Sequence, residues 1–258
     1  MPSAFDRFAQ LIYQQCGTRL KSDKRNLLIT RLRHRLRHHG FPEDDLGLEA
    51  YWEVVEREIK SPTTTPSKNS LIESPDGFLS GPGKTTPESS LEEIPAIIDA
   101  ITTQETYFER TPAAFEWFSR DFLGRMISSE GTASIIESGP QQPKILIWSA
   151  ACSIGAEVYS LAARLLADAH PALLGRIQLQ GSDICRIAIE RARDPAYSPR
   201  LAKGVDPDLR DRLFEPRQSD DGNYIVRRCL RERVHFFVHN LLDKPPLKNV
   251  DVCFCKTY

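Results

Sequence analysis

The stretch KILIWSAACSIGAEVYS, residues 144–160, decides the fold of the C-terminal part of the chain. Its first five residues, KILIW, are mostly apolar and typical of a buried strand. Small residues follow from Ala150 to Gly155, and from Val158 onward apolar residues recur at the spacing of one helix face. The stretch therefore predicts a strand, a tight turn and a helix, an order that can hold a nucleotide-like ligand at the helix N-terminus.

The same alternation continues after this stretch. IQLQGSD (177–183) predicts a second strand and CRIAIERAR (185–193) a second helix, while VHFFV (234–238) and DVCFC (251–255) predict two further strands. Strands that alternate with helices predict an α/β fold with a parallel sheet. Between them, NYIVRRCLRERV (223–234) follows a turn signal and predicts a small inserted hairpin.

The N-terminal part has a different pattern. Residues 5–59 are helical in pattern, with Leu28, Leu32 and Leu36 on one face and Gly40 as a helix stop. Residues 61–92 are dominated by Ser, Thr, Pro and Gly, which predicts a flexible linker because so few apolar groups cannot offset the entropy of ordering. We therefore expect a helical domain at 1–60, a linker at 61–92 and an α/β domain at 93–258.

The α/β domain begins, on this division, with two further helical segments. These are LEEIPAIIDAI (91–101) and AAFEWFSRDFLGRMI (113–127), whose Phe115, Phe118 and Phe122 share a face. The inserted β-subdomain is expected around residues 214–233.

Charge is balanced over the whole chain but not along it. The 258 residues include 34 basic and 35 acidic side chains, so no overall field favours nucleic acid or a membrane surface. The basic run is local: between Lys21 and His39 there are seven Lys/Arg and one acid, Asp23. A solvated helix face and a surface for an anionic partner both explain it.

No segment predicts membrane insertion or secretion. Apolar runs are shorter than the roughly 20 residues that span a bilayer, and the charged N-terminus has no uninterrupted apolar core. The six cysteines form no CxxC pair, so buried free thiols in a reducing compartment fit better than a metal site. We therefore expect a cytoplasmic protein without a metal.

Three predicted strand ends carry groups suited to a ligand. The turn 150–155 precedes a helix N-terminus, Asp183 ends the second strand, and Asn240 follows the third. Each has a structural explanation alone, since small residues make tight turns and Asp caps helices. Together they predict an adenosine-containing ligand, because a carboxylate accepts from both ribose hydroxyls and an amide matches an adenine edge. Because no GxGxxG cradle is present, S-adenosylmethionine fits better than NAD, and an NAD-dependent oxidoreductase is the more distant alternative.

Five segments in order resemble the chemotaxis receptor methyltransferase (CheR) family. QETYFER (104–110) is similar to its N-x-T-x-F-F-R motif, and IWSAACSIGAEVYSLA (147–162) to its W-S-A-G-C-S-T-G-E-E-P-Y-S-I-A. GSDICRIAIERARDPAYS (181–198) is similar to its T-D-I-D segment with the trailing A-x-x-G-x-Y. VHFFVHNLL (234–242) and DVCFCK (251–256) are similar to V-x-F-x-x-x-N-L and D-x-I-F-C-R-N. The resemblance covers nearly the whole chain apart from the linker.

The resemblance implies a fold, a reaction and a set of residues. It implies a small all-helical domain before a Rossmann-like S-adenosylmethionine-dependent methyltransferase domain that transfers a methyl group to receptor glutamates. Arg110 would position the substrate carboxylate, although a structural ion pair with Glu109 or Asp121 is the alternative. The implied positions around S-adenosylmethionine are Gln104, Thr106, Arg110, Glu157, Asp183, Asn240, Leu241, Cys255 and Lys256. The resemblance also implies a monomer whose basic helix, residues 24–39, faces an acidic helical chemoreceptor.

Several residues depart from the family pattern. Ala151 replaces a glycine, Ala156 the first acid of G-E-E-P, Val158 its proline, Cys185 the second acid of T-D-I-D, and Lys256 an arginine. The sequence given ends at Tyr258, after the fourth expected strand, where the family continues with a helix and three more strands. We therefore expect a truncated methyltransferase domain without the C-terminal strands, which binds the methyl donor weakly or not at all. The alternative function is a non-catalytic module that binds the receptor.

Overall fold

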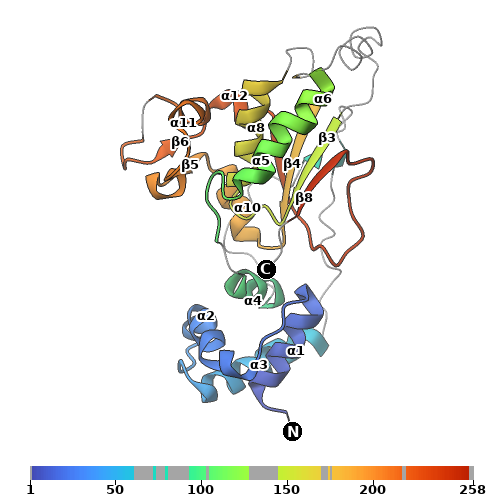
Figure 1. Ribbon diagram of the computed structural model, residues 1–258. Helices are drawn as coiled ribbons and strands as arrows, with labels where there is room; N and C mark the ends of the chain where they lie inside the picture. Colours follow the sequence, from blue (N-terminus) through green and yellow to red (C-terminus); the bar gives the residue numbers. More distant parts are fainter. Residues whose placement is uncertain are drawn as a thin grey trace. The chain divides into compact units, whose positions relative to one another are not determined.

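The computed structural model describes residues 2–60, 72–73, 79–80, 93–102, 105–127, 145–169, 174, 176–216 and 219–255. Its internal contacts divide the chain into two compact units (Figure 1). The helical unit comprises Met1–Ile72, Gly81–Thr103 and Asn240–Lys244. The sheet unit comprises Glu73–Ser80, Gln104–His239 and Pro245–Tyr258.

The described part of the helical unit contains four α-helices. These are α1 (Ala4–Cys16), α2 (Arg25–His38), α3 (Asp45–Lys60) and α4 (Glu93–Ile101), with a 3-10 turn, η1 (Ser22–Lys24), before α2. The start of α1 is fixed by a capping box, in which Ser3 and Asp6 satisfy each other's backbone N–H groups. It ends at Gly17, whose φ of 74° is the left-handed conformation that favours glycine.

The predicted leucine stripe of α2 forms part of this unit's core. Leu28, Leu32 and Leu36 are buried, together with Phe8 of α1 and Tyr51 of α3. The prediction of an apolar face at spacing four is confirmed because these residues lie on successive turns of one helix.

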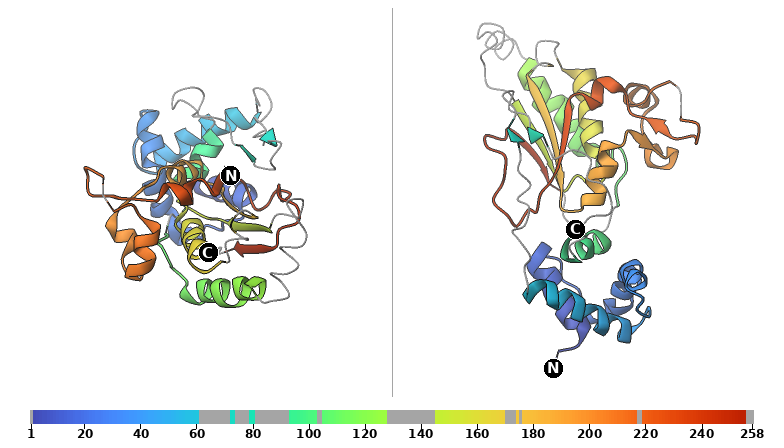
Figure 2. Two further views of the ribbon diagram at one scale, coloured as in Figure 1. Left: turned by 90° about the horizontal axis from the view of Figure 1, so that it is seen from above. Right: turned by 180° about the vertical axis from the view of Figure 1, so that it is seen from behind.

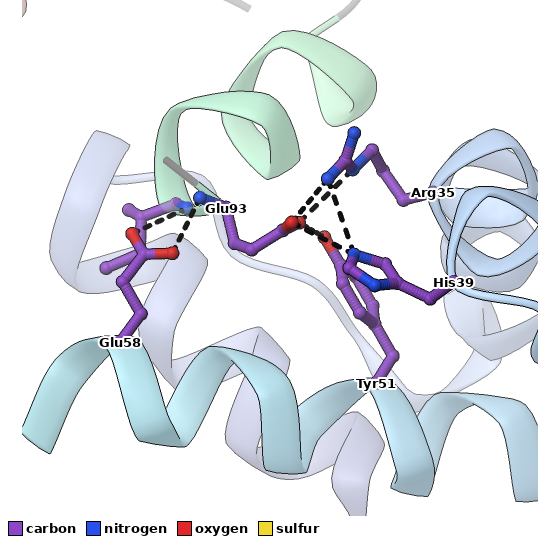
Figure 3. A network of polar contacts seen from close by, with 6 residues as sticks. Arg35, His39, Tyr51, Glu58 and Glu93 are labelled. Atoms are coloured by element: carbon purple, nitrogen blue, oxygen red, sulfur yellow. Dashed lines mark hydrogen bonds and ion pairs between the residues drawn. The ribbon is translucent and has the colours of Figure 1, made fainter. Parts of the chain in front are cut away.

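The helix α4 packs in the helical unit, which differs from the expected boundary at residue 93. Ile97 is fully buried in the helical core, and Glu93 enters a network with α2 and α3 (Figure 3). The Glu93 carboxylate accepts hydrogen bonds from Tyr51 Oη at 2.5 Å and from Arg35 Nε at 3.2 Å, and contacts His39 Nε2 at 2.9 Å. The apolar pattern of 91–101 predicted a helix correctly but carries no information about which core the helix joins.

The sheet unit is organised around four parallel strands in the order β7–β4–β3–β8. These are β3 (Ile145–Ala150), β4 (Ile177–Asp183), β7 (Val234–Val238) and β8 (Val252–Cys255). All four lie where the sequence predicts them, so the parallel α/β fold is confirmed. The chain runs outward from β3 through β4 to β7 and then returns to the other side of β3. The direction of strand order therefore reverses at β3, the place where parallel sheets bind ligands.

Helices pack on this sheet. They are α5 (Pro112–Trp117), the π-helical η2 (Phe118–Leu123), α6 (Gly124–Ile127), α8 (Ala156–Asp168) and α10 (Arg186–Arg193). Figure 1 shows α5 and α6 in front of the strands, and Figure 2 shows the strands from the opposite side. Phe115 and Phe118 are buried and Phe122 stacks on Phe118, as their shared face predicts.

The inserted β-structure differs from the expected hairpin at 223–234. Its strand β6 (Tyr224–Ile225) pairs with β5 (Ala196–Tyr197), and an isolated bridge joins Phe214 to Val226. Residues Arg228–Arg231 form a short helix, α12, and the insertion also contains η4 (Pro199–Ala202) and α11 (Pro207–Leu213). The turn signal at 219–223 locates a chain reversal, but the pairing partner lies upstream in sequence.

The expected linker at 61–92 lies almost wholly outside the described residues. Within it, β1 (Ile72–Glu73) and β2 (Leu79–Ser80) pair with each other. Among the described helices, none has both the length and the apolar character needed to cross a bilayer.

Candidate functional site

The turn after β3 has an unusual backbone. Ala151, Ser153 and Gly155 have φ values of 60°, 52° and 84°, so alternate residues occupy the left-handed region. The conformation is held by hydrogen bonds from the Cys152 N–H to the Ser182 carbonyl (2.8 Å) and from the Tyr197 hydroxyl to the Ile154 carbonyl (2.6 Å). Positive φ at two non-glycine residues is uncommon and persists only where surrounding contacts enforce it, as they do at ligand-binding turns.

Gly155 is required at the N-terminus of α8 for two reasons. Its φ of 84° is strained for any residue with a Cβ, and an added Cβ would lie 2.8 Å from Phe236 Cζ and 2.9 Å from Ala192 Cβ. At the small-residue turn predicted from the sequence, the N-terminus of α8 therefore lies close to both β7 and α10.

Asp183 connects the ends of β3 and β4. Its carboxylate accepts from the Ser153 N–H at 2.8 Å and from the Cys185 N–H at 3.0 Å, and only 8% of the residue is exposed. The helix-cap explanation considered above does not hold, because the N-cap of α10 is Cys185 and Asp183 accepts from the N–H of that residue. A carboxylate is a group that can accept hydrogen bonds from ligand hydroxyls.

Glu157 lies in the first turn of α8, near the same place. Its Oε1 accepts from Ser149 Oγ at 2.9 Å, at the end of β3. Cys152, in the turn after β3, has a buried thiol. Burial raises the pKa of Cys152 well above its usual value, and the negative charges of Asp183 and Glu157 raise it further. Glu157 and Asp183 therefore both bond to the segment 149–153, at Ser149 and Ser153.

The loop 105–110 carries two more of the described candidates, Thr106 and Arg110. Phe108 anchors the loop, because its ring is buried against Tyr197 and its N–H donates to the Leu201 carbonyl at 3.0 Å. Thr106 and Arg110 are half-buried. The Arg110 guanidinium donates to the Glu105 carbonyl and lies 5.9 Å from the centre of the Tyr107 ring.

The remaining candidates lie elsewhere or outside the described residues. Asn240 belongs to the helical unit, where its Nδ2 donates to the Gln15 carbonyl at 2.7 Å and its Oδ1 accepts from the Leu242 N–H at 3.1 Å. Leu241, in the same unit, is 39% exposed. Cys255 is exposed on β8 and is paired in register with Ala150. Gln104 and Lys256 lie outside the described residues.

The basic helix does not present all of its arginines to solvent. Arg35 was expected on the partner-facing surface, but it is only 7% exposed and pairs with Glu93 in the helical core. Arg37 pairs with Glu43, whereas Arg31 and Arg33 are exposed and form no ion pair within the described part of the chain. The sequence spacing missed this because Arg35 neighbours Leu36 and lies near Leu32 on the buried side.

Sequence reasoning missed several groups that shape the site. Ser149 donates to Glu157, and Glu109 forms an ion pair with Arg164 of α8. The small-residue run pointed to the turn, but no sequence signal identifies a pair separated by 55 residues.

The described residues fit an adenosyl ligand. A buried carboxylate, that of Asp183, lies at the end of β4, beside a positive-φ turn and a helix N-terminus. Small side chains from Ala150 to Ser153 let the turn backbone approach a ligand closely. Within the described residues there is no group of three or more potential metal ligands.

Comparison with known proteins agrees with this geometry. A family model described as the CheR methyltransferase SAM binding domain matches residues 104–257, and the CheR methyltransferase all-alpha domain matches residues 3–60. Chemotaxis protein methyltransferase Cher2 of Pseudomonas putida is 24% identical over 258 residues, covering 98% of this chain and 77% of that protein. The chemotaxis protein methyltransferase of Salmonella typhimurium is 30% identical over 257 residues, covering 98% and 71%. The chain therefore belongs to the CheR methyltransferase family, with S-adenosylmethionine as its methyl donor.

Proposed function

We propose that this chain methylates glutamate side chains of a chemoreceptor or a related signalling protein in the cytoplasm. The observation that carries the proposal is the Asp183 carboxylate, held at the end of β4 against the positive-φ turn of the matched methyltransferase domain. The names of the relatives, chemotaxis protein methyltransferases, support the choice of a receptor substrate.

The donor would be held by residues from several strand ends. Asp183 would accept from the ribose hydroxyls, and Glu157 would meet the charged methionyl end. Asn240 and Leu241 are proposed on either side of the adenine, which requires Asn240 to exchange its bond to Gln15 for the ligand. The other proposed donor contacts are Gln104, Thr106, Cys255 and Lys256.

The chemistry needs positioning more than proton transfer. Bound S-adenosylmethionine supplies an electrophilic methyl group on a sulfonium. A glutamate with a pKa near 4.3 is already ionised at neutral pH, so no general base is required. We propose that Arg110 holds the substrate carboxylate, because a guanidinium fork matches two carboxylate oxygens. Aligned reactants in a site that excludes water account for the rate.

The partner surface would be the exposed part of α2. Arg31 and Arg33 are exposed, which suits an acidic helical partner, whereas Arg35 is committed to the core. Exposed charges at this density accelerate association and fix orientation more than they add affinity.

Methyl transfer to receptor preparations tests the proposal. The chain is incubated with tritiated S-adenosylmethionine, and volatile radioactivity is counted after mild base, because a glutamyl methyl ester is base-labile. We expect base-labile label with the unsubstituted chain, loss of at least about 100-fold in Arg110→Gln, and little change in Arg228→Gln, whose exposed pair lies in α12. Receptor binding without any transfer would instead support the non-catalytic module.

A further inference from the structure

An ion pair next to Arg110 ties the loop 105–110 to α8. Arg164 Nε lies 3.1 Å from both carboxylate oxygens of Glu109, and Arg164 Nη2 donates to the same carboxylate. The side chains are only 11% (Glu109) and 22% (Arg164) exposed, so solvent screens the pair weakly. A bidentate contact of this kind fixes orientation as well as distance.

The backbone of Glu109 is held by the same helix. Its N–H donates to the Oγ of the fully buried Ser160 at 3.3 Å, and Ser160 lies one turn before Arg164. Its φ is 59°, a conformation that a residue with a Cβ adopts only when surrounding contacts enforce it. Side chain and backbone of Glu109 are thus both fixed to one face of α8.

Arg164 also contacts the segment that follows Arg110. Its Nη1 donates to Ser119 Oγ at 3.2 Å, and its guanidinium carbon lies 5.7 Å from the centre of the Phe115 ring. The Arg164 side chain therefore contacts Glu109, immediately before Arg110, and also contacts α5 and η2, shortly after it.

These contacts on both sides of Arg110 determine where its backbone lies. A sharp positive-φ turn at Glu109 sets the direction in which the next residue leaves the backbone, and Pro112 begins α5 two residues later. The same helix carries Glu157, seven residues before Arg164 and so on nearly the same face. The pair thus sets the distance between the loop that carries Arg110 and the helix that carries Glu157.

We infer that Glu109 and Arg164 act as positioning residues that aim Arg110 at the substrate carboxylate, an inference that rests on the proposed glutamate methylation. In the motif quoted above, the position of Glu109 is a phenylalanine, so the pair is a feature of this chain. Misplacement of a catalytic group by about 1 Å can cost on the order of 100-fold in rate.

The test compares turnover with donor affinity in matched variants. We expect Glu109→Gln and Arg164→Gln each to lower kcat at least about 10-fold, and the double variant to be no worse than either, because the two residues act as one unit. Affinity for S-adenosylhomocysteine, measured by calorimetry, should change less than about 3-fold. Arg233→Gln, which removes an arginine bond to the Leu174 carbonyl away from the loop, should keep the original turnover.

A double-mutant cycle between Glu109 and Arg110 distinguishes a positioning role of Glu109 from general structural damage. In an Arg110→Lys background, adding Glu109→Gln should cost less than about 3-fold, because Arg110 is the group through which Glu109 acts. Equal losses in both backgrounds, or full turnover in Glu109→Gln, would overturn the inference while leaving the proposed function intact. If Glu109→Gln fails to fold, Arg164→Lys keeps the charge without the fork, and unchanged kcat in that variant would also overturn it. Absence of transfer by the unsubstituted chain would instead refute the proposed function.

Discussion

The carboxylate of Asp183 combines two tasks that a substitution can separate. It satisfies the N–H groups of Ser153 and Cys185, and in the proposed function it also accepts from the ribose. Asp183→Ala should lower the free energy of unfolding by about 1–3 kcal/mol, because two N–H groups lose their partner, and weaken S-adenosylhomocysteine binding at least about 10-fold. Denaturant titration and calorimetry measure the two effects.

Asp206→Ala is the matched control for that substitution. Asp206 also accepts from two backbone N–H groups, at the start of α11. We expect a loss of about 1 kcal/mol of stability with unchanged ligand affinity. Equal affinity losses in the two variants would show that Asp183 acts only through stability.

Ala151 tests whether the turn stores backbone strain. Its φ of 60° costs an alanine about 1–2 kcal/mol, whereas glycine is unstrained there but loses more entropy on folding. Ala151→Gly should therefore raise the free energy of unfolding by about 0.5–1 kcal/mol. Ala163→Gly, within α8, should lower it by about 1 kcal/mol or more. Thermal and denaturant unfolding measure both changes. Equal losses of stability in the two variants would contradict the hypothesis that Ala151 is strained.

Among the strands, β7 contains a group that makes stability depend on pH. Burial, and to a lesser degree the charge of Arg193, lower the pKa of His235 from its usual 6.5 to about 4. The folded chain therefore keeps this imidazole neutral where the unfolded chain protonates it, so stability falls as pH drops from 6.5 toward 4.

His235→Gln should flatten that pH dependence. Because His235 is partly exposed, we expect the difference in unfolding free energy between pH 7 and pH 4.5 to shrink by about 1–2 kcal/mol. Urea titrations across this range measure it. Parallel pH profiles for the two proteins would show that His235 is not the group responsible.

The elements best predicted from sequence are those with a strong local pattern. The strands β3, β4, β7 and β8 are short apolar runs of β-formers between turn residues, and their positions match. The packing of α4 and the pairing of β6 with β5 were not predictable in this way, because each depends on a partner distant in sequence. Local periodicity specifies a face, not the surface that covers it.

The same division applies to the site. Asp183 was singled out because the ends of neighbouring parallel strands meet at one edge, whereas Glu157 was implied only by the family resemblance. Asn240 follows β7 as predicted, but its amide bonds to Gln15, and the direction of an amide after a strand is not encoded locally. Arg35 looked like one cation in a solvated run, yet a buried Glu93 58 residues away determines where it points.

At the scale of the whole molecule, a different group in each unit makes stability depend on pH: His235 in the sheet unit and Glu93 in the helical unit. Burial raises the pKa of Glu93, but hydrogen bonds from Tyr51, Arg35 and His39 outweigh it, so the net pKa lies below the usual 4.5. A lowered carboxyl pKa gives stability that is present above pH 4.5 and is lost as pH falls through the folded value. The helical unit should therefore lose protection below about pH 4.5.

Glu93→Gln tests at neutral pH how much the hydrogen-bond network around Glu93 stabilises the helical unit. Removing one partner of a buried pair leaves Arg35 uncompensated, so we expect hydrogen exchange in α2, α3 and α4 to accelerate by an amount equivalent to about 3 kcal/mol. Glu43→Gln breaks the exposed pair with Arg37 and should leave these exchange rates nearly unchanged. Equal exchange rates in the two variants would contradict the role given to the network.

The most direct test of the site is to map where the methyl donor binds. Tritiated S-adenosylmethionine is cross-linked to the chain by ultraviolet light, with and without excess S-adenosylhomocysteine, and the labelled peptides are identified. If the donor binds at the ends of β3 and β4, label should appear in peptides containing residues 149–157 or 183–185 and should be lost when excess S-adenosylhomocysteine is present. Label confined to other peptides, or no competable label at saturating donor, would contradict it.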